Sequence, residues 1–453
     1  MRARDRQRTE RQRWNRFLTY WYGHLVSLIG DYLTLVALPL AAFKLSGSAV
    51  VTGAVEMVQV GGSILFGTAL GTLADRSDAR RVLIGCDLAR AVMMGGLAAL
   101  FALDMASWGE VLVVSFGLGT LRALHDGAEG VLLARLIPDD MEVRAFARLE
   151  AADSLGNLAG PTLGGSLAAI ALAWSFSVDA VTFLIGAAMV ILTTRDHSLL
   201  RAISEAPSAA ASSTDATGAS GPAGPAGPAA ATATAEATAD DHATFRYALR
   251  AIRAQPRYVQ WVGAYASSNI AVVGFGALLI PFAERELKVG SVVIGLMVSA
   301  SGIGGLIVTP WLDRQREVRL DHAAWSLVII ASVSILAGLV VSVVTVTIGM
   351  VAIGASYAVA TSHSNAIRQQ LFPPNLQGRV RLTTRTVMQL ATLISILSGA
   401  AVSQYIGARW VFVVFGSIAL VSIVAIGLIR TDVAPTRRPP GSGGAPSEPA
   451  QPG

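Results

Sequence analysis

The chain has 453 residues, of which 53% are hydrophobic and 14% charged, and its mean hydropathy is +0.55. This composition excludes an ordinary soluble globular protein and indicates a protein of the lipid bilayer. The net charge of +5 does not indicate a nucleic-acid partner, because the arginines lie in loops between apolar runs rather than on one basic face. A single cysteine, Cys86, excludes an internal disulfide and a Cys-rich metal site.

The chain opens with a basic segment, residues 1–16, that carries seven arginines and precedes an apolar run too long for a signal peptide. We expect it to stay attached as a cytoplasmic tail. A helix that crosses the hydrocarbon needs about 20 mostly apolar residues, and six such runs follow within an N-terminal half, residues 17–195. These runs cover residues 17–43, 49–73, 82–103, 109–134, 144–170 and 174–194.

A segment rich in Ala, Ser, Thr, Gly and Pro, residues 196–244, separates this half from the next and is predicted to be a flexible cytoplasmic linker. Residues 245–257 then place arginines and apolar residues on opposite sides of a helix, which predicts an amphipathic helix in the headgroup layer. The C-terminal half, residues 258–430, holds apolar runs at 258–282, 289–312, 323–342, 345–371, 380–402 and 409–429, and residues 431–453 are predicted to be a disordered cytoplasmic tail.

The positions of Lys and Arg support twelve spans with both termini inside the cell. Of the 35 such residues, 29 fall in segments predicted to face the cytoplasm and four in segments predicted to face outside. The remaining two, Arg90 and Arg122, lie within spans. An omitted or extra span would scramble this alternation.

Two landmarks recur at nearly one offset and indicate an internal duplication. Leu73-Ala74-Asp75-Arg76 is echoed by Leu312-Asp313-Arg314, and the Leu-Ile-Pro turn at 136–138 is echoed by Leu-Phe-Pro at 371–373. Matching landmarks in corresponding loops of two six-span halves are expected of a parallel repeat. The fold class predicted is therefore an all-α membrane protein of twelve transmembrane helices in two pseudo-symmetric halves.

The loop at 71–81 resembles the signature loop of the major facilitator superfamily, and the twelve spans resemble the architecture of that family. Gly30-Asp31, the run at 87–90 and the glycines at 160–165 resemble its enterobactin exporter and macrolide efflux branch. The resemblance implies a cytoplasmic gate, in which Asp75 faces the start of the eleventh helix at 378–381 and Asp313 faces the start of the fifth. The expected gate residues are Gly71, Asp75, Arg76, Arg80, Asp313 and Arg314; a solvated turn that only sets topology is the alternative.

The fifth span carries small residues three and four positions apart together with a proline, which predicts close helix packing and a bend. These residues, which resemble the antiporter motif of drug exporters, are Gly156, Gly160, Pro161, Gly164 and Gly165. Helix packing without a transport role is the alternative.

Ionisable groups inside a span are costly and therefore indicate function. Asp31, near the middle of the first span, is the leading candidate for a carboxylate that titrates or faces substrate. The other N-terminal candidates for proton coupling or substrate binding are Glu56, Arg122, Asp126, Glu129, Asp153 and Asn157. The set around Arg122 and His125 can equally be a self-neutralising polar stripe, with residues four apart paired along the helix.

The C-terminal half offers mainly uncharged candidates, Asn269 and His363, so we expect the proton chemistry in the N-terminal half. No phosphate-binding loop, metalloprotease motif, nucleophile elbow or Cys/His cluster is found. The sequence therefore predicts neither an enzyme nor a cofactor or metal.

These features predict a monomeric secondary transporter of the cell membrane that exports a small amphipathic compound by alternating access, with proton exchange as the drive. The midplane site would be lined by the first, fourth, fifth, seventh, tenth and eleventh spans. Three alternatives remain: an importer or facilitator on the same fold, a lysophospholipid flippase, and a membrane sensor or scaffold without transport.

Overall fold

The computed structural model describes residues 2–138, 141–194, 250–313, 320–372 and 374–426. Within them, each of the twelve predicted spans coincides with one long helix. The first six are α1 (Arg2–Ser46), α2 (Ala49–Arg76), α3 (Ala79–Ala102), α4 (Trp108–Leu136), α5 (Glu142–Ile170) and α6 (Leu172–Thr193). The second six are α9 (Pro256–Phe282), α10 (Ser291–Asp313), α11 (Leu320–Leu339), α12 (Val343–Leu371), α13 (Pro374–Ile406) and α14 (Ala408–Ala425), with a π-helical turn, η2 (Ala283–Leu287), after α9.

Ten of these described helices are long and apolar enough to cross a membrane. The two that fall short by this measure are α4 and α5, which carry the ionisable residues Arg122, His125, Asp126, Glu129 and Asp153. The twelve-span prediction therefore holds for the position of every helix, while the hydropathy of α4 and α5 is lowered by the polar groups that make these helices of interest.

The N-terminal basic segment, predicted to be a cytoplasmic tail, is helical from Arg2 onward and continuous with the first span in α1. Arg, Gln and Glu are good helix formers, so nothing in the segment stops the helix. Trp14 and Phe17 are buried, and Trp14 lies beneath the guanidinium groups of Arg144 and Arg148 at the start of α5. Of the predicted interfacial segment, residues 250–253 are helical, a turn follows, and residues 256–257 already belong to α9. Residues 245–249, the linker at 196–244 and the tail at 431–453 lie outside the described residues.

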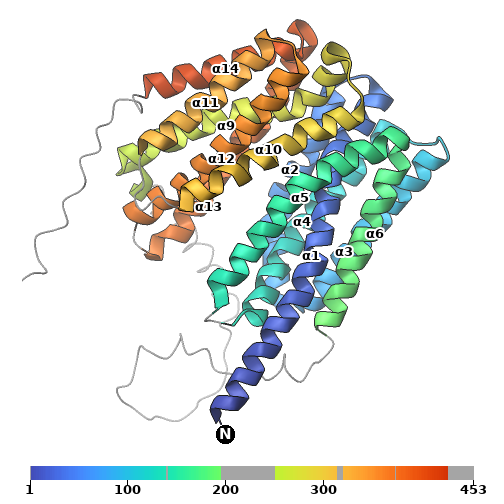
Figure 1. Cartoon of the computed structure of the whole chain (residues 1–453), viewed down its shortest axis with the longest axis vertical. Coiled ribbons are helices and arrows are strands. Elements are labelled where there is room, and N and C mark those ends of the chain that lie inside the picture. The colour runs from blue at the N-terminus through green and yellow to red at the C-terminus, as the bar shows by residue number, and fades with distance from the viewer. Residues whose placement is uncertain (1, 139–140, 195–249, 314–319, 373, 427–453) are drawn as a thin grey trace, which may run out of the picture.

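Figure 1 shows the halves as two bundles, one running from blue to green and the other from yellow to red, which lie against each other through α5 and α10 and also through α2 and α13. α10 is the second helix of its half, as α2 is, and α13 is the fifth helix, as α5 is. Each contact therefore joins the fifth helix of one half to the second helix of the other. Such a pair of equivalent contacts is expected of a parallel duplication.

The contact between α5 and α10 is made by backbone. A Cβ added at Gly295 would overlap the carbonyl oxygen of Pro161, and one added at Gly165 would overlap that of Ser291. Only glycine permits so close an approach. Beside it, the Oγ1 of Thr162 and the Oγ of Ser299 are 2.7 Å apart.

Further contacts that join the halves lie toward the ends at which α1, α5 and α9 finish. Arg285 donates a hydrogen bond to the carbonyl oxygen of Gly47, and its guanidinium carbon lies 5.1 Å from the ring centre of Phe43. On α2, Gly53 faces Ile396 and Ala400 of α13. A core of apolar side chains continues this contact across the two halves: Val36, Leu40, Phe43, Ala168, Ile280, Ala283 and Ile294. All these residues occupy helix ends that the sequence predicts to face outside.

Candidate functional site

A polar cavity of about 390 Å³ lies within the N-terminal half. Its lining comes from α1, α3, α4 and α5, so α3 contributes although the sequence did not predict that it would, and none of the lining comes from the C-terminal half. The lining residues are His24, Ser27, Leu28, Asp31, Arg90, Arg122, His125, Asp126, Glu129, Leu133, Leu149 and Asp153.

The leading candidate, Asp31, is paired in this cavity with Arg122. The Arg122 Nη1 atom lies 3.8 Å from Asp31 Oδ2, and the two side chains are 23% (Asp31) and 56% (Arg122) exposed. The pair joins α1 to α4, whereas the sequence suggested a pairing of Arg122 with Asp126 one turn along α4. Both groups are open to the cavity, so they are able to change partners without unfolding a helix.

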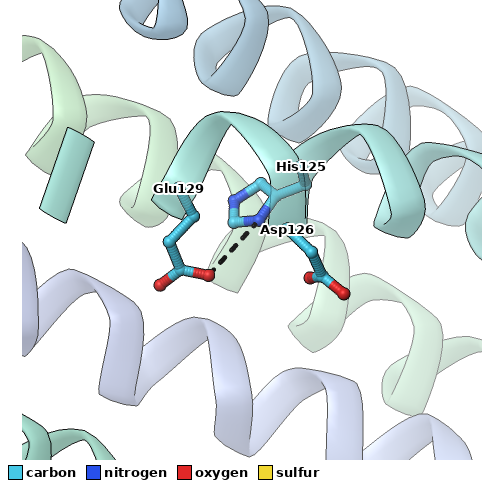
Figure 2. A group of neighbouring side chains, drawn as sticks. All are labelled: His125, Asp126 and Glu129. Carbon is cyan, nitrogen blue, oxygen red and sulfur yellow. Dashed lines mark ion pairs between the residues drawn. The ribbon is translucent and has the colours of Figure 1, made fainter. Parts of the chain in front are cut away.

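Glu129 links α4 to α1 through contacts with two side chains of α1. Its Oε1 atom accepts a hydrogen bond of 2.7 Å from the Tyr20 hydroxyl and lies 3.2 Å from the Nδ1 of His24. Its Oε2 atom lies 4.0 Å from the Nδ1 of His125 on the same helix. Figure 2 shows His125, Asp126 and Glu129 projecting from one side of α4. Together they bring one imidazole nitrogen and two carboxylate oxygens within 4.8 Å of one another.

Behind His125, α3 supplies a charged pair that the sequence analysis did not include among the candidates. Asp87 and Arg90 are 2% and 3% exposed, and the Oδ1 of Asp87 lies 3.5 Å from the Nε2 of His125. The Nε and Nη2 atoms of Arg90 make no hydrogen bond within the described residues, and its guanidinium carbon lies 5.4 Å from the ring centre of Phe183. Their three-residue spacing within an apolar helix is the signal that would have identified them.

The α5 candidates lie beside α1. Asp153 accepts a hydrogen bond of 3.0 Å from the Tyr32 hydroxyl, so its partner is the tyrosine next to Asp31. Gly156 and Gly160 lie against Tyr32, and Gly164 against the backbone of Leu33, with no room for a Cβ. Asn157, one turn after Asp153, lies at the approach of Gly302 on α10, away from the cavity lining.

Three further candidates do not line the cavity. Glu56 is half-buried on α2. Asn269, on α9, donates hydrogen bonds to the Thr392 hydroxyl at 3.0 Å and to the Met388 carbonyl at 3.3 Å on α13, which makes it a link between helices of the C-terminal half. His363 bonds through Nδ1 to the Val359 carbonyl one turn earlier, and its ring lies 6.4 Å from that of His322.

The predicted gate lies at the ends of α2 and α10. Gly71, Asp75 and Arg76 fall in the last turns of α2, and Asp313 is the final residue of α10, but their side chains, and the whole of Arg314, lie outside the described residues. In the following turn, the carboxylate of Asp78 caps α3 by accepting a hydrogen bond of 3.1 Å from the backbone N–H of Arg80.

The family model described as Major Facilitator Superfamily matches residues 20–395. Macrolide efflux protein A of Streptococcus pyogenes is 25% identical over 179 residues, which are 39% of this chain and 43% of that protein. An uncharacterised MFS-type transporter of Bacillus subtilis, YfiS, is 23% identical over 429 residues, covering 93% of this chain and 94% of that protein.

Solved structures share the fold at low identity. A bacterial homologue of the iron transporter ferroportin, in an inward-facing state, superposes with a TM-score of 0.66 and 14% identity over 91% of this chain and 98% of that chain. A peptide transporter of the POT family superposes with a TM-score of 0.66 and 15% identity over 91% of this chain and 94% of that chain.

Proposed function

The chain belongs to the major facilitator superfamily, and we propose that within this family it exports a small amphipathic compound by proton-coupled alternating access. The observation that carries the proposal is the cavity in the N-terminal half, where Asp31 and Arg122 form an ion pair inside a bundle of apolar helices. Charged groups are expensive in the hydrocarbon and persist there where they serve a transport path.

The contacts between the halves support alternating access. Among the described residues, the hydrogen bonds that join the halves lie in the parts of the helices predicted to face outside: Arg285 with Gly47 at the helix ends, and Thr162 with Ser299 closer to the middle. With both termini in the cytoplasm of a cell membrane, we interpret this as the state that is open inward and closed outward. Export then requires these contacts to break while the cytoplasmic ends of α2 and α13, and of α5 and α10, come together.

Asp31 is the residue that we propose to carry the proton. When ionised it pairs with Arg122 across α1 and α4; when protonated it loses its charge and releases the guanidinium. A proton that enters from outside therefore frees Arg122, and loss of that proton to the cytoplasm restores the pair. Breaking and re-forming the ion pair thus couples proton entry to a rearrangement of α1 against α4, which is the role in transport that we propose for the pair.

The direction and the class of compound rest on the macrolide efflux protein to which part of the chain is similar. Transport measured in inside-out vesicles separates export from import, and competition by lysophospholipids separates a drug exporter from a lipid flippase.

The test is export from cells or proteoliposomes with and without an uncoupler. The wild type should lose export when the proton gradient is dissipated, and Asp31→Asn should export at a low rate that the uncoupler does not change. Glu110 is a half-exposed acid in the first turn of α4, and the control variant Glu110→Gln should keep the gradient dependence. Export by the wild type that is insensitive to the gradient would exclude proton coupling.

A further inference from the structure

The cavity brings together two imidazoles and several carboxylates that the transport proposal leaves without a role. We propose that His24, His125, Asp126 and Glu129, which we term the α1–α4 cluster, bind one divalent transition-metal ion, with Asp87 orienting His125. This inference does not rest on the identity of the exported compound or on the proton role of Asp31. Metal binding by this cluster can be measured without any transport assay.

The distances within the cluster suit ligands of one ion. Two ligand atoms that each lie about 2.1 Å from a metal are about 3 to 3.5 Å apart. The Nδ1 of His24 and Oε1 of Glu129 are 3.2 Å apart. The Nδ1 of His125 lies 4.0 Å from Oε2 of Glu129, which is too long for a hydrogen bond and closes to ligand spacing with a side-chain movement of about 1 Å.

The second observation is the buried carboxylate of Asp87. This side chain is 2% exposed, and its Oδ1 makes no hydrogen bond within the described residues although it lies 3.5 Å from the Nε2 of His125. We assign the ring proton of neutral His125 to Nε2, facing this oxygen, which leaves its lone pair on Nδ1, on the side of Glu129. Histidines that bind metals commonly direct their other nitrogen to a carboxylate, which fixes the tautomer and raises the basicity of the ligand.

Glu129 is oriented in a similar way. The hydroxyl of Tyr20 donates to its Oε1 atom at 2.7 Å, and the tyrosine ring stacks at 5.7 Å on that of His24. One side chain of α1 thus positions a ligand from each of the two helices. Such outer partners hold ligands in place before the ion arrives.

The charges around the cluster favour a cation. Asp87, Asp126, Glu129 and Asp153 contribute four negative charges, and Arg90, which lines the same cavity as Asp153, contributes one positive charge. Asp31 and Arg122 neutralise each other. With both imidazoles neutral, the cluster and its charged neighbours carry a net negative charge that a divalent cation would reduce, whereas an anion attracted by Arg90 would make it more negative.

The donor set decides which cations fit. Imidazole nitrogens favour Fe²⁺, Co²⁺, Ni²⁺, Cu²⁺ and Zn²⁺, while Mg²⁺, Ca²⁺ and Mn²⁺ prefer oxygen ligands. A site with two nitrogens and two carboxylates therefore selects the transition metals. The sequence alone gave no sign of it, because His24 and His125 are far apart in the chain and meet only through the packing of α1 on α4.

The experiment uses the full chain in detergent micelles, purified through a tag without histidine and freed of metal with a chelator that is then removed. Co²⁺ is the probe, because its visible absorption reports nitrogen and oxygen ligands. We expect one Co²⁺ per chain, displaced by Zn²⁺ and unaffected by equal concentrations of Mg²⁺. A wild-type protein that elutes as a single symmetric peak and binds no stoichiometric Co²⁺ would overturn the proposal.

Variants locate the ion. Glu129→Gln and His24→Asn should each weaken Co²⁺ binding about tenfold or more, and Asp87→Asn should weaken it about 10- to 100-fold by releasing His125. Glu110→Gln makes the same substitution on the same helix outside the cavity and should bind as the wild type does. Glu129→Gln binding equal to wild type would refute the site.

A measurement on the unaltered protein guards against variants that fail to fold. X-ray absorption of the Zn²⁺-loaded wild type should show nitrogen and oxygen ligands at about 2.0 to 2.1 Å with the scattering pattern of imidazole, and no sulfur. A sulfur ligand would assign the ion to Cys86 and refute the proposal.

Discussion

Arg122 on α4 and Asp31 on α1 face each other across the cavity with their nearest charged atoms 3.8 Å apart. The pair lies at the boundary between two helices, and the Arg122 side chain is 56% exposed. Because an exposed pair contributes at most about 1 kcal/mol to stability, its value to the protein lies elsewhere. We expect its removal to affect transport far more than folding.

Arg122→Gln should lower export about tenfold or more while it changes the free energy of unfolding by about 1 kcal/mol or less. Export should fall because Asp31 would no longer have a cation that competes with the proton for its carboxylate. Arg122→Lys keeps the charge and should retain part of the activity. Transport assays and thermal unfolding of the same preparations give both numbers, and a loss of activity matched by a large loss of stability would contradict the assignment.

The contact between Thr162 and Ser299 offers a direct test of which side is closed. The pair Thr162→Cys and Ser299→Cys should form a disulfide under mild oxidation, because the hydroxyl oxygens are 2.7 Å apart. The cross-linked protein should stop transporting and recover on reduction. Cys86 is buried and should not interfere, and each single-cysteine variant serves as a control. Full transport by the cross-linked protein would argue against opening at this contact.

Gly295→Ala should loosen the join between the halves. Its Cβ would overlap the carbonyl oxygen of Pro161 and lie 3.2 Å from the Cα of Gly165, and overpacking of this kind costs about 1 to 3 kcal/mol. The rate of the disulfide cross-link between positions 162 and 299 should therefore fall. Gly305→Ala, on the same helix with open space around it, is the matched control, and equal rates in the two variants would show that the glycine contact is not tight.

The cytoplasmic gate predicted from the sequence can be tested against the same cross-link. Asp75→Cys and Gly378→Cys should join α2 to α13 when the inner ends close, and this disulfide should exclude the one between positions 162 and 299. The yield of each disulfide is measured on one protein that carries all four substitutions. After proteolysis, the gel mobility of the fragments shows which of the two disulfides has formed. Simultaneous formation of both disulfides in the same molecules would remove the gating role of Asp75.

The positions of the helices could be predicted because hydropathy and charge act locally. Runs of apolar residues and the bias of arginine toward loops placed all twelve helices near their observed bounds. The helical state of residues 2–16 was not part of the prediction, because it goes with the burial of Trp14 and Phe17, which only the tertiary structure reveals.

The site could be predicted only in part. Asp31, Arg122 and Glu129 are recognisable one at a time, since a charge within an apolar run is conspicuous. Their partners depend on how each helix is rotated about its axis, which the sequence does not specify. The same limit explains why His24 and Asp87 were overlooked, and why Asn269 was expected to face substrate although it bonds to α13.

The join between α5 and α10 is made of glycine backbone at Gly165 and Gly295. At these two glycines one bundle can tilt on the other without a side chain of either residue having to change rotamer. The resistance to tilting then comes from the few bonds around it, chiefly Thr162 with Ser299 and Arg285 with Gly47. Substitutions at these bonds should therefore tune how often the transporter turns over, without altering what it recognises.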